Sequence, residues 1–486
     1  MKKKSLHPEW ALACKREKTE LRRINGKYYL YEVTSKWNPQ KKRSVKITGK
    51  YLGKITEADG FVESEKARLR KQQINVERVQ VKEYGVTAAI SQLFPDTTAA
   101  LKEFFPDCWK QLIILAYGRL VYQSPLKNMS FHYANSYLSE EYPNVDMSAK
   151  SLSYFIRELG QDRNRIVQFC RSFKISDDCI LFDGTDIFSQ SEQMELPKFS
   201  KSKFGTYDDM INLMNIFSVK LQTPVYYRLL PGNIKDVSAF KTCLLESGVK
   251  EATVIIDKGF ASMSNIEALE NEDLKFIVPL PRSSSLIDYE TVKSGDRRLF
   301  DGYFLYEGRY IWHYTRTVDE KKSITVFLDE ELRNREEKDY LNRIESKVEK
   351  YTIDKFYDKR HTFGTIAVIK NTGKSAHETY SDYKTRGQVE TMIDALKNIV
   401  DADCTYMQNQ LALEGWMFVN LIALKWYYQI LNLLKKYELN KKYSVTDFLI
   451  FLAEVKKVKI NDTWQMAEVT KKNLNLMQKL DILNIT

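Results

Sequence analysis

The chain has 486 residues, of which 43% are hydrophobic and 29% are charged, and its formal net charge is +11 at pH 7. This length and apolar content predict a folded protein of about three domains, at ~150 residues each, and exclude an intrinsically disordered chain. The six cysteines form no Cys-x-x-Cys pair and the five histidines are scattered, so we expect reduced thiols and no structural zinc.

The positive charge is concentrated at the start of the chain. Residues 1–54 contain sixteen lysines and arginines against four glutamates, a balance of +12. Such a segment attracts a polyanion through counterion release, and a nucleic acid is the expected partner, with ordinary solubilising charge as the alternative. The basic start is not followed by the apolar stretch of a secretory signal, so we expect a cytoplasmic protein.

The first elements in chain order are strands. Residues 20–56 alternate polar and apolar side chains, and the segments 27–33 and 44–52 flank a polar turn, which predicts a basic antiparallel hairpin or small sheet. We assign residues 1–60 to a β-rich DNA-binding element. The side chains expected to contact DNA lie at or near its turn: Lys41, Lys42, Arg43 and Lys46.

Helical spacing of apolar residues follows, and predicts four or five helices in a helical DNA-binding domain over residues 84–175. From residue 179 the pattern becomes strand-rich, in the order β-β-β-α-β-α-β. The five predicted strands cover residues 180–182, 210–219, 225–230, 252–256 and 275–280, and the two helices lie near 236–247 and 265–269. This order predicts an α/β core with a mixed sheet, formed by residues 176–282 and 379–405.

Residues 283–378 interrupt that core. They contain strand-like segments at 303–306, 310–314 and 323–328 and a charged helix at 329–350, which is too much for a loop and predicts an inserted β-rich subdomain. Residues 406–486 are expected to form a helical C-terminal domain. Its most apolar stretch, residues 416–434, is interrupted by Asn420, Lys425, Gln429 and Asn432, so it predicts a buried helix and no membrane span.

Two aspartates follow predicted core strands: Asp183 comes after residues 180–182, and Asp257 after residues 252–256. Open α/β sheets gather ligands at the carboxyl ends of their strands, so we expect both side chains at one edge. A misplaced strand end would favour Asp177, Asp178 or Asp186 over Asp183. The ordinary alternative for Asp257 is a cap of the next helix.

A third acid lies in a distinctive helical pattern. Tyr383, Arg386, Glu390 and Lys397 have offsets of three, seven and fourteen, which fall within roughly 60° of one helix face. An apolar stripe adjoins that face: Val389, Met392, Ile393 and Leu396. A helix packed across the sheet edge brings Glu390 to the two aspartates, with Asp394 as a further partner or an exposed acid. The alternative is a solvated face with an Arg386–Glu390 pair.

Three clustered carboxylates repel one another unless cations neutralise them. Oxygen ligands without histidine or cysteine select Mg²⁺ or Mn²⁺. Two such ions, about 3.5 to 4 Å apart, activate the attacking oxygen and stabilise the leaving oxygen of a phosphodiester. The predicted catalytic residues and metal ligands are therefore Asp183, Asp257 and Glu390, and the predicted reaction is phosphodiester cleavage or transfer to another hydroxyl.

These motifs resemble those of bacterial insertion-sequence DDE transposases. The resemblance rests on Asp183-Gly-Thr185, Pro231-Gly-Asn-Ile-Lys-Asp236, Asp257-Lys-Gly-Phe260 and the Tyr383/Arg386/Glu390/Lys397 pattern. It points to the branch with a Tyr-Arg-Glu-Lys signature and a β-rich insertion in a ribonuclease H-like core, and it extends over nearly the whole chain. It implies that Tyr383, Arg386 and Lys397 contact DNA near the cleaved end.

The resemblance further implies a bacterial, nucleoid-associated enzyme that excises an element by water attack and joins its 3′-OH ends to target DNA. A homodimer would hold both terminal inverted repeats of double-stranded DNA, with two Mg²⁺ or Mn²⁺ ions in each active site. Trp312 would stack on an extruded base, although an aromatic residue here is more often part of a core. Lys198, Lys201 and Lys203 would either hold the DNA backbone or form an exposed basic loop.

Two other functions stay open. The same acids would serve a ribonuclease H-like nuclease that cuts DNA without strand transfer. A catalytically silent DNA-binding protein would keep the basic segment and lose the chemistry.

Overall fold

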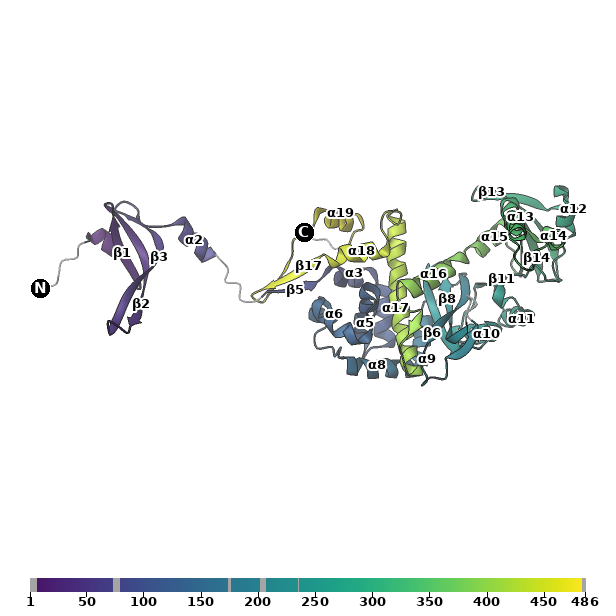
Figure 1. The fold of residues 1–486 in the computed structure, drawn as a ribbon, viewed down its shortest axis with the longest axis horizontal. Coiled ribbons are helices and arrows are strands. Elements are labelled where there is room, and N and C mark those ends of the chain that lie inside the picture. Colours follow the sequence, from purple (N-terminus) through teal and green to yellow (C-terminus); the bar gives the residue numbers. More distant parts are fainter. Residues whose placement is uncertain (1–6, 73–78, 174–175, 202–206, 235, 483–486) are drawn as a thin grey trace. The chain divides into compact units, whose positions relative to one another are not determined.

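The computed structural model describes residues 7–72, 79–173, 176–201, 207–234 and 236–482. The chain divides into two compact units, which are drawn in Figure 1. The N-terminal unit comprises residues 1–80 and 459–464, and the main unit comprises residues 81–458 and 465–486.

The N-terminal unit contains a four-stranded antiparallel sheet in the order β1-β2-β3-β4. Its elements are α1 (Glu9–Ala13), β1 (Thr19–Ile24), β2 (Lys27–Asn38), β3 (Arg43–Thr56), β4 (Gly60–Glu63) and α2 (Glu65–Gln72). The pairing of β2 with β3 confirms the predicted hairpin, which β1 and β4 widen into a sheet. A small core of Ala11, Leu21, Tyr28, Leu30 and Ile55 holds one end of it.

The main unit begins with β5 (Val79–Glu83), whose first residues belong to the other unit, and then becomes helical. The helices are α3 (Gly85–Leu93), α4 (Pro95–Phe104), α5 (Trp109–Tyr122), α6 (Met129–Asn135), α7 (Leu138–Glu141), α8 (Ala149–Gln161) and α9 (Arg163–Arg171). This region contains more helices than the predicted four or five, because its connections include the short helices α6 and α7. The long helix α17 (Gln410–Lys436) packs on α5, α8 and β9. Figure 1 shows it between the helices α5 and α8 and the sheet that contains β6 and β8.

The backbones of α8 and α17 nearly touch where two glycines face each other. A Cβ on Gly160 would lie 1.8 Å from the Leu411 carbonyl oxygen, and one on Gly415 would lie 2.1 Å from that of Ile156. Buried polar groups of α17 find partners: Asn420 accepts from Arg119 at 2.9 Å, and Lys425 donates to the Thr223 hydroxyl at 3.3 Å. In the part of the chain that the structure describes, no helix is both long and apolar enough to cross a membrane.

A large mixed sheet forms the centre of the main unit, so the fold is mixed α/β as predicted. Its first strands and helices are β6 (Cys179–Ser189), β7 (Lys198–Lys201), β8 (Tyr207–Ser218), β9 (Thr223–Pro231), α10 (Asp236–Ser247), β10 (Thr253–Ile256), α11 (Met263–Asn271) and β11 (Lys275–Pro279). β8 pairs antiparallel with β6 and β9, whereas β10 runs parallel to β6 and to β11.

The strands between residues 283 and 378 continue this same sheet. They and their helices are α12 (Glu290–Ser294), β12 (Gly302–Tyr306), β13 (Arg309–Thr317), β14 (Ser323–Asp329), α13 (Glu330–Glu345), α14 (Ile353–Lys359) and β15 (Thr365–Lys370). β15 pairs antiparallel with both β11 and β14, so the inserted strands lengthen the core sheet. We did not predict β15, although its sequence, Thr-Ile-Ala-Val-Ile-Lys, is rich in β-branched residues.

The chain returns to the core through α15 (Ala376–Lys384), which begins with a capping box between Ser375 and Glu378. The remaining elements are α16 (Gly387–Asn398), β16 (Cys404–Thr405), α17, α18 (Val445–Ala453), β17 (Lys456–Ile460), β18 (Thr463–Met466) and α19 (Lys471–Lys479). α16 packs against β6 and β8. Val389, Met392 and Leu396 are buried there, as the predicted apolar stripe requires, and Ile393 is half-buried.

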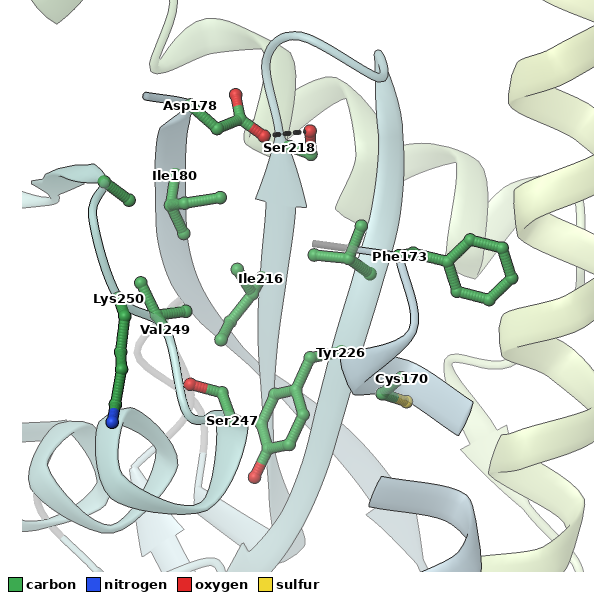
Figure 2. Close-up of a pocket in the computed structure, with 12 residues that line it drawn as sticks. Cys170, Phe173, Asp178, Ile180, Ile216, Ser218, Tyr226, Ser247, Val249 and Lys250 are labelled. Carbon is green, nitrogen blue, oxygen red and sulfur yellow. Dashed lines mark hydrogen bonds between the residues drawn. The ribbon is translucent and has the colours of Figure 1, made fainter. Parts of the chain in front are cut away.

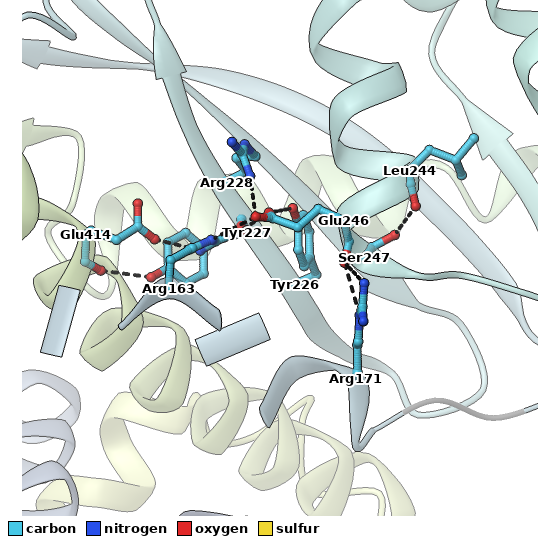
Figure 3. A network of polar contacts seen from close by, with 9 residues as sticks. All are labelled: Arg163, Arg171, Tyr226, Tyr227, Arg228, Leu244, Glu246, Ser247 and Glu414. Atoms are coloured by element: carbon cyan, nitrogen blue, oxygen red, sulfur yellow. Dashed lines mark hydrogen bonds and ion pairs between the residues drawn. The ribbon is translucent and has the colours of Figure 1, made fainter. Parts of the chain in front are cut away.

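A polar network fastens the helices to the sheet (Figure 3). Arg163 of α9 lies 2.8 Å from Glu246 of α10 and 2.6 Å from Glu414 of α17. Arg228 of β9 also binds Glu246, and Tyr226 donates its hydroxyl to the same carboxylate. Burial alone raises the pKa of Glu246, but the hydrogen bonds from Arg163 and Arg228 outweigh it and lower that pKa to about 2.

Candidate active site

Asp183 lies inside a strand, so the prediction that it follows the end of a strand is wrong. β6 continues to Ser189 because Ile187 and Phe188 pair with Ile211 and Met210 of β8. The Asp183 side chain is buried, with the residue 6% exposed, and its Oδ1 accepts a hydrogen bond from the Gly184 backbone at 2.8 Å.

Asp257 comes directly after β10, as predicted. The parallel register pairs Ile256 with Phe182, so Asp257 follows at the level of Asp183 on the adjacent strand. Adjacent strands lie ~4.8 Å apart, and side chains at the same level of parallel strands point to the same face. Asp257 makes no capping hydrogen bond, and Ser262 caps α11 instead. The sheet therefore brings two carboxylates together and gives Asp257 no capping role.

The rival aspartates lie elsewhere. Asp186 is three residues beyond Asp183, and an odd offset in a strand places the two side chains on opposite faces. Asp178 lies at the other end of β6, where its carboxylate accepts from the Ser218 hydroxyl (Figure 2) and from the Lys220 backbone at 2.9 Å. Asp177 precedes it in a turn with a φ of 56°. Asp178 is thus a structural group beside a small cavity of about 30 Å³.

The predicted single helix through Tyr383 and Lys397 is wrong at residues 385–386. The helix tightens there into i to i−3 hydrogen bonds, from Arg386 to the Tyr383 carbonyl at 3.1 Å and from Gln388 to the Thr385 carbonyl at 2.8 Å. The Thr385 hydroxyl bonds back to the Asp382 carbonyl at 2.6 Å, a local alternative to helical bonding. Tyr383 therefore belongs to α15, and Glu390 belongs to α16.

Arg386, at the start of α16, joins the acids. Its Nη1 lies 2.5 Å from Asp257 Oδ1, and its Nη2 lies 2.6 Å from Glu390 Oε1. Burial lowers the pKa of Arg386, but the negative charges of Asp257, Glu390 and Asp183 together raise it. The Arg386–Glu390 pair was the alternative interpretation of the spacing, whereas the bond to Asp257 depends on tertiary structure. Arg386 therefore binds two of the three acids, and the parallel register of β6 and β10 places the third, Asp183, at the level of Asp257.

Tyr383 is half-buried beside this group. Burial raises the pKa of its phenol, Arg386 opposes that shift, and the carboxylates of Asp257 and Glu390 add to it. The phenol therefore stays protonated and can donate a hydrogen bond. Lys397 lies two helical turns beyond Glu390, about 10 Å along the axis. Within the described ranges it forms no ion pair with the three acids.

Other predicted residues lie away from the acids. Asp394 accepts from Asn398 of its own helix at 2.6 Å. Trp312 is half-buried against Phe300 and Tyr303, with the guanidinium of Arg297 over its ring. This packing favours the core role that we weighed against base stacking. Lys198 is exposed on β7, Lys203 lies outside the described residues, and so does the side chain of Lys201.

The basic residues predicted to bind DNA lie in the N-terminal unit. Lys41 and Lys42 form the turn between β2 and β3, and Arg43 and Lys46 follow on β3. All four are exposed, and Lys46 lies 3.7 Å from Glu20. This half of the hairpin carries few buried residues, so its cations are available to a polyanion.

The donor atoms at the acid cluster are all carboxylate oxygens, which suit Mg²⁺ or Mn²⁺. Arg386 supplies the positive charge there. Across the described residues, no group of three acidic, histidine or cysteine side chains is arranged to hold a metal ion. The carboxylate oxygens of the acids suit such an ion, and the repulsion between neighbouring carboxylates favours a bound cation.

Comparison with known proteins gives one family. Residues 175–426, which include Asp183, Asp257 and Glu390, match the model of the transposase DDE domain. No curated protein sequence matches the chain. A piggyBac transposase synaptic complex with hairpin DNA is 12% identical, with a TM-score of 0.40, and the match covers 71% of this chain and 69% of that one.

Two Mos1 transposase structures are also similar. The paired-end complex with the left transposon end is 10% identical, with a TM-score of 0.15 and coverage of 32% of this chain and 53% of that one. The strand transfer complex is 11% identical, with a TM-score of 0.17 and coverage of 58% and 75%. The model of the transposase DDE domain matches more than half of the residues of this chain. The chain therefore belongs to the transposase DDE domain family and is a DNA transposase, an enzyme that cleaves and joins DNA.

Proposed function

We propose that this transposase cleaves DNA at the terminal inverted repeats of an insertion sequence and transfers the 3′-OH ends to target DNA. Asp183, Asp257 and Glu390 are the catalytic acids. The observation that carries the proposal is that Arg386 binds both Asp257 and Glu390, while the register of β6 and β10 sets Asp183 level with Asp257.

The catalytic core is ribonuclease H-like. The strand neighbours β9-β8-β6-β10-β11 support this, with two antiparallel pairings on one side of β6 and two parallel pairings on the other. The core comprises residues 176–282 and 379–405, with the insertion at 283–378. The DNA-binding regions are residues 1–60 and 84–175, and residues 406–486 form the C-terminal domain.

Asp183, Asp257 and Glu390 would hold two Mg²⁺ or Mn²⁺ ions. Bound there, the ions supply activation of the attacking oxygen and stabilisation of the leaving oxygen. Arg386 holds Asp257 and Glu390 close together, because its guanidinium forms an ion pair with each of them. Its planar guanidinium also matches two oxygens of a phosphate, and the Tyr383 phenol can donate to a third. Lys397 contacts DNA farther along α16.

The enzyme acts on double-stranded DNA as a homodimer that holds both element ends, in the bacterial cytoplasm at the nucleoid. Lys41, Lys42, Arg43 and Lys46 bind the DNA backbone. The surplus of basic residues in the N-terminal segment favours a protein that must hold specific DNA ends over a nuclease that only cuts. The intact cluster of acids favours an active enzyme over a silent DNA-binding protein.

The test is nicking and joining of DNA that carries the element's inverted repeats, with and without Mg²⁺. We expect metal-dependent nicking followed by strand joining, and loss of both in Asp257→Asn. Asp394→Asn is the matched control, since this acid lies on α16 and bonds Asn398. Nicking without joining would establish the nuclease instead, and binding without nicking would establish the silent protein.

A further inference from the structure

A groove of about 960 Å³ opens within the insertion. Its walls come from α13, α14 and the 3₁₀ turn Arg360–Thr362, and one end is lined by Lys258 and Arg282. Lys258 directly follows Asp257. Arg282 comes three residues after β11, and β11 runs parallel to β10, so both cations leave the sheet at the edge where Asp257 lies. One end of the groove therefore lies at the sheet edge where Asp257 follows β10.

The groove is strongly basic. Six lysines and arginines line it against three acids. Two of the cations are already paired, Arg282 with Glu336 at 2.9 Å and Arg343 with Asp339 at 2.8 Å. The other four are exposed and form no ion pair with any described residue: Lys258, Arg335, Lys350 and Lys359. Their charges are free to meet a ligand that carries several negative charges.

The same groove has an aromatic wall. Tyr340, Tyr351 and Phe363 line it, and the rings of Tyr340 and Tyr351 lie 4.8 Å apart. Arg343 donates to the Tyr351 hydroxyl at 3.2 Å and lies 5.2 Å from the centre of its ring. Tyr351 is thus held in place by Tyr340 and Arg343, and the residue stays partly exposed. Tyr340 and Phe363 are each only 7% exposed and belong to a small core of the insertion, so Tyr351 is the ring that a base can reach. A fixed aromatic ring beside free cations is a combination that binds single-stranded nucleic acid.

We propose that this groove binds one strand of DNA as that strand leaves the cleavage site. Lys258, Arg335, Lys350 and Lys359 contact successive phosphates, and a base stacks on Tyr351. A single strand fits better than a duplex because rings inside a groove reach only unpaired bases, whereas a duplex presents its phosphates on the outside. The inference rests on the proposed function for its direction, since the acid cluster marks the cleavage site.

The first test measures binding without metal, so that it does not depend on catalysis. The full chain is titrated with a fluorescein-labelled single-stranded oligonucleotide of mixed sequence, and with the matching duplex, over a range of KCl concentrations. For Lys350→Ala/Lys359→Ala we expect the slope of log K against log salt for the single strand to fall by about 1.4, or about 0.7 for each lost phosphate. The slope for the duplex should change less.

Lys321→Ala is the matched control, because Lys321 is an exposed lysine of the same insertion in the turn between β13 and β14. An unchanged single-strand slope in the double variant would overturn the proposal. So would a loss confined to the duplex, because it would assign the groove to double-stranded DNA. Unchanged thermal unfolding of both variants shows that the fold is intact.

The second test locates the strand. p-Benzoylphenylalanine in place of Tyr351 should crosslink to the single-stranded oligonucleotide on irradiation, whereas the same group in place of Tyr303, an exposed tyrosine outside the groove, should not. Equal crosslinking at both positions would contradict a specific path. Asp257→Asn separates the two proposals: it should abolish nicking and leave the single-strand slope unchanged.

Discussion

The guanidinium of Arg386 contacts Asp257 across 129 residues of sequence, at 2.5 Å, and contacts Glu390 one turn along its own helix at 2.6 Å. It therefore provides positive charge where three carboxylates would otherwise repel one another. Any divalent cation bound to these acids competes with it for the same oxygens. Arg386 thus has two opposed effects, since it orders the acids and also lowers their affinity for a cation.

We predict that Arg386→Ala increases the affinity of the DNA-free protein for Mn²⁺ while it slows DNA nicking. Loss of the competing guanidinium frees the carboxylates, but loss of a phosphate donor should slow nicking by about 10² to 10³-fold. Thermal unfolding at increasing Mn²⁺ gives the affinity, because a ligand of the folded state raises the melting temperature. Arg386→Lys keeps the positive charge, so its Mn²⁺ affinity and its nicking rate should both lie between those of the unaltered protein and Arg386→Ala. Weaker Mn²⁺ binding by Arg386→Ala would contradict competition.

The opposite faces of β6 give a second prediction. Asp183→Asn should reduce nicking on the order of 10³-fold or more, because it removes one of the three acids to which we assign catalysis. Asp186→Asn, on the other face of the same strand, should keep most of the activity. Single-turnover rates of nicking in Mg²⁺ measure both. A severe loss in Asp186→Asn with little effect of Asp183→Asn would move the site to the opposite face of the sheet.

Sequence patterns singled out the three acids but did not predict the details of the backbone that carries them. Asp183 is followed by Gly184, Thr185 and Asp186, which have the composition of a turn. Only the pairing of Ile187 and Phe188 with β8 keeps that segment extended. Likewise, the 3.6-residue period does not detect the tightened turn at residues 385–386, because i to i−3 bonds change the rotation by little over so short a stretch.

The sequence also did not predict the contacts between segments that are far apart along the chain. β15 joins β11 through the pairing of Ile369 with Val278, and no local pattern predicts which strands of an insertion will reach the core. The basic groove has the same origin, since Lys258, Arg335 and Lys350 become neighbours only through tertiary structure. A local signal existed for Lys258, a cation directly after Asp257, but lysine is too common for that position to carry a prediction.

The exposed end of the β2–β3 hairpin gives a third prediction. Lys41→Ala/Lys42→Ala should lower the salt slope of duplex DNA binding by about two, or about one for each lost phosphate contact. Lys66→Ala is the control, because Lys66 is an exposed lysine of α2 in the same unit. Fluorescence anisotropy at several salt concentrations measures the slope. If the double variant keeps the slope of the unaltered protein, the hairpin does not contact the backbone.

The last prediction concerns the network around Glu246 and its dependence on pH. The folded pKa of Glu246 is lowered from 4.5 to about 2, so its contribution to stability is complete above pH 4.5 and is lost as the pH falls through 2. A shift of that size corresponds to about 3 kcal/mol. Glu246→Gln should lower the free energy of unfolding at pH 7 by about that amount and flatten its decline between pH 4.5 and 2.

Urea unfolding followed by circular dichroism at pH 7, 4 and 3 measures this dependence. Glu246 binds Arg163 and Arg228, and Arg163 keeps its second partner, Glu414, when Glu246 is replaced. The stability of the variant should therefore approach that of the unaltered protein as the pH is lowered. A constant difference between the two proteins from pH 7 to pH 3 would mean that Glu246 stabilises the fold through packing, because the loss of an ion pair disappears once the carboxylate is protonated.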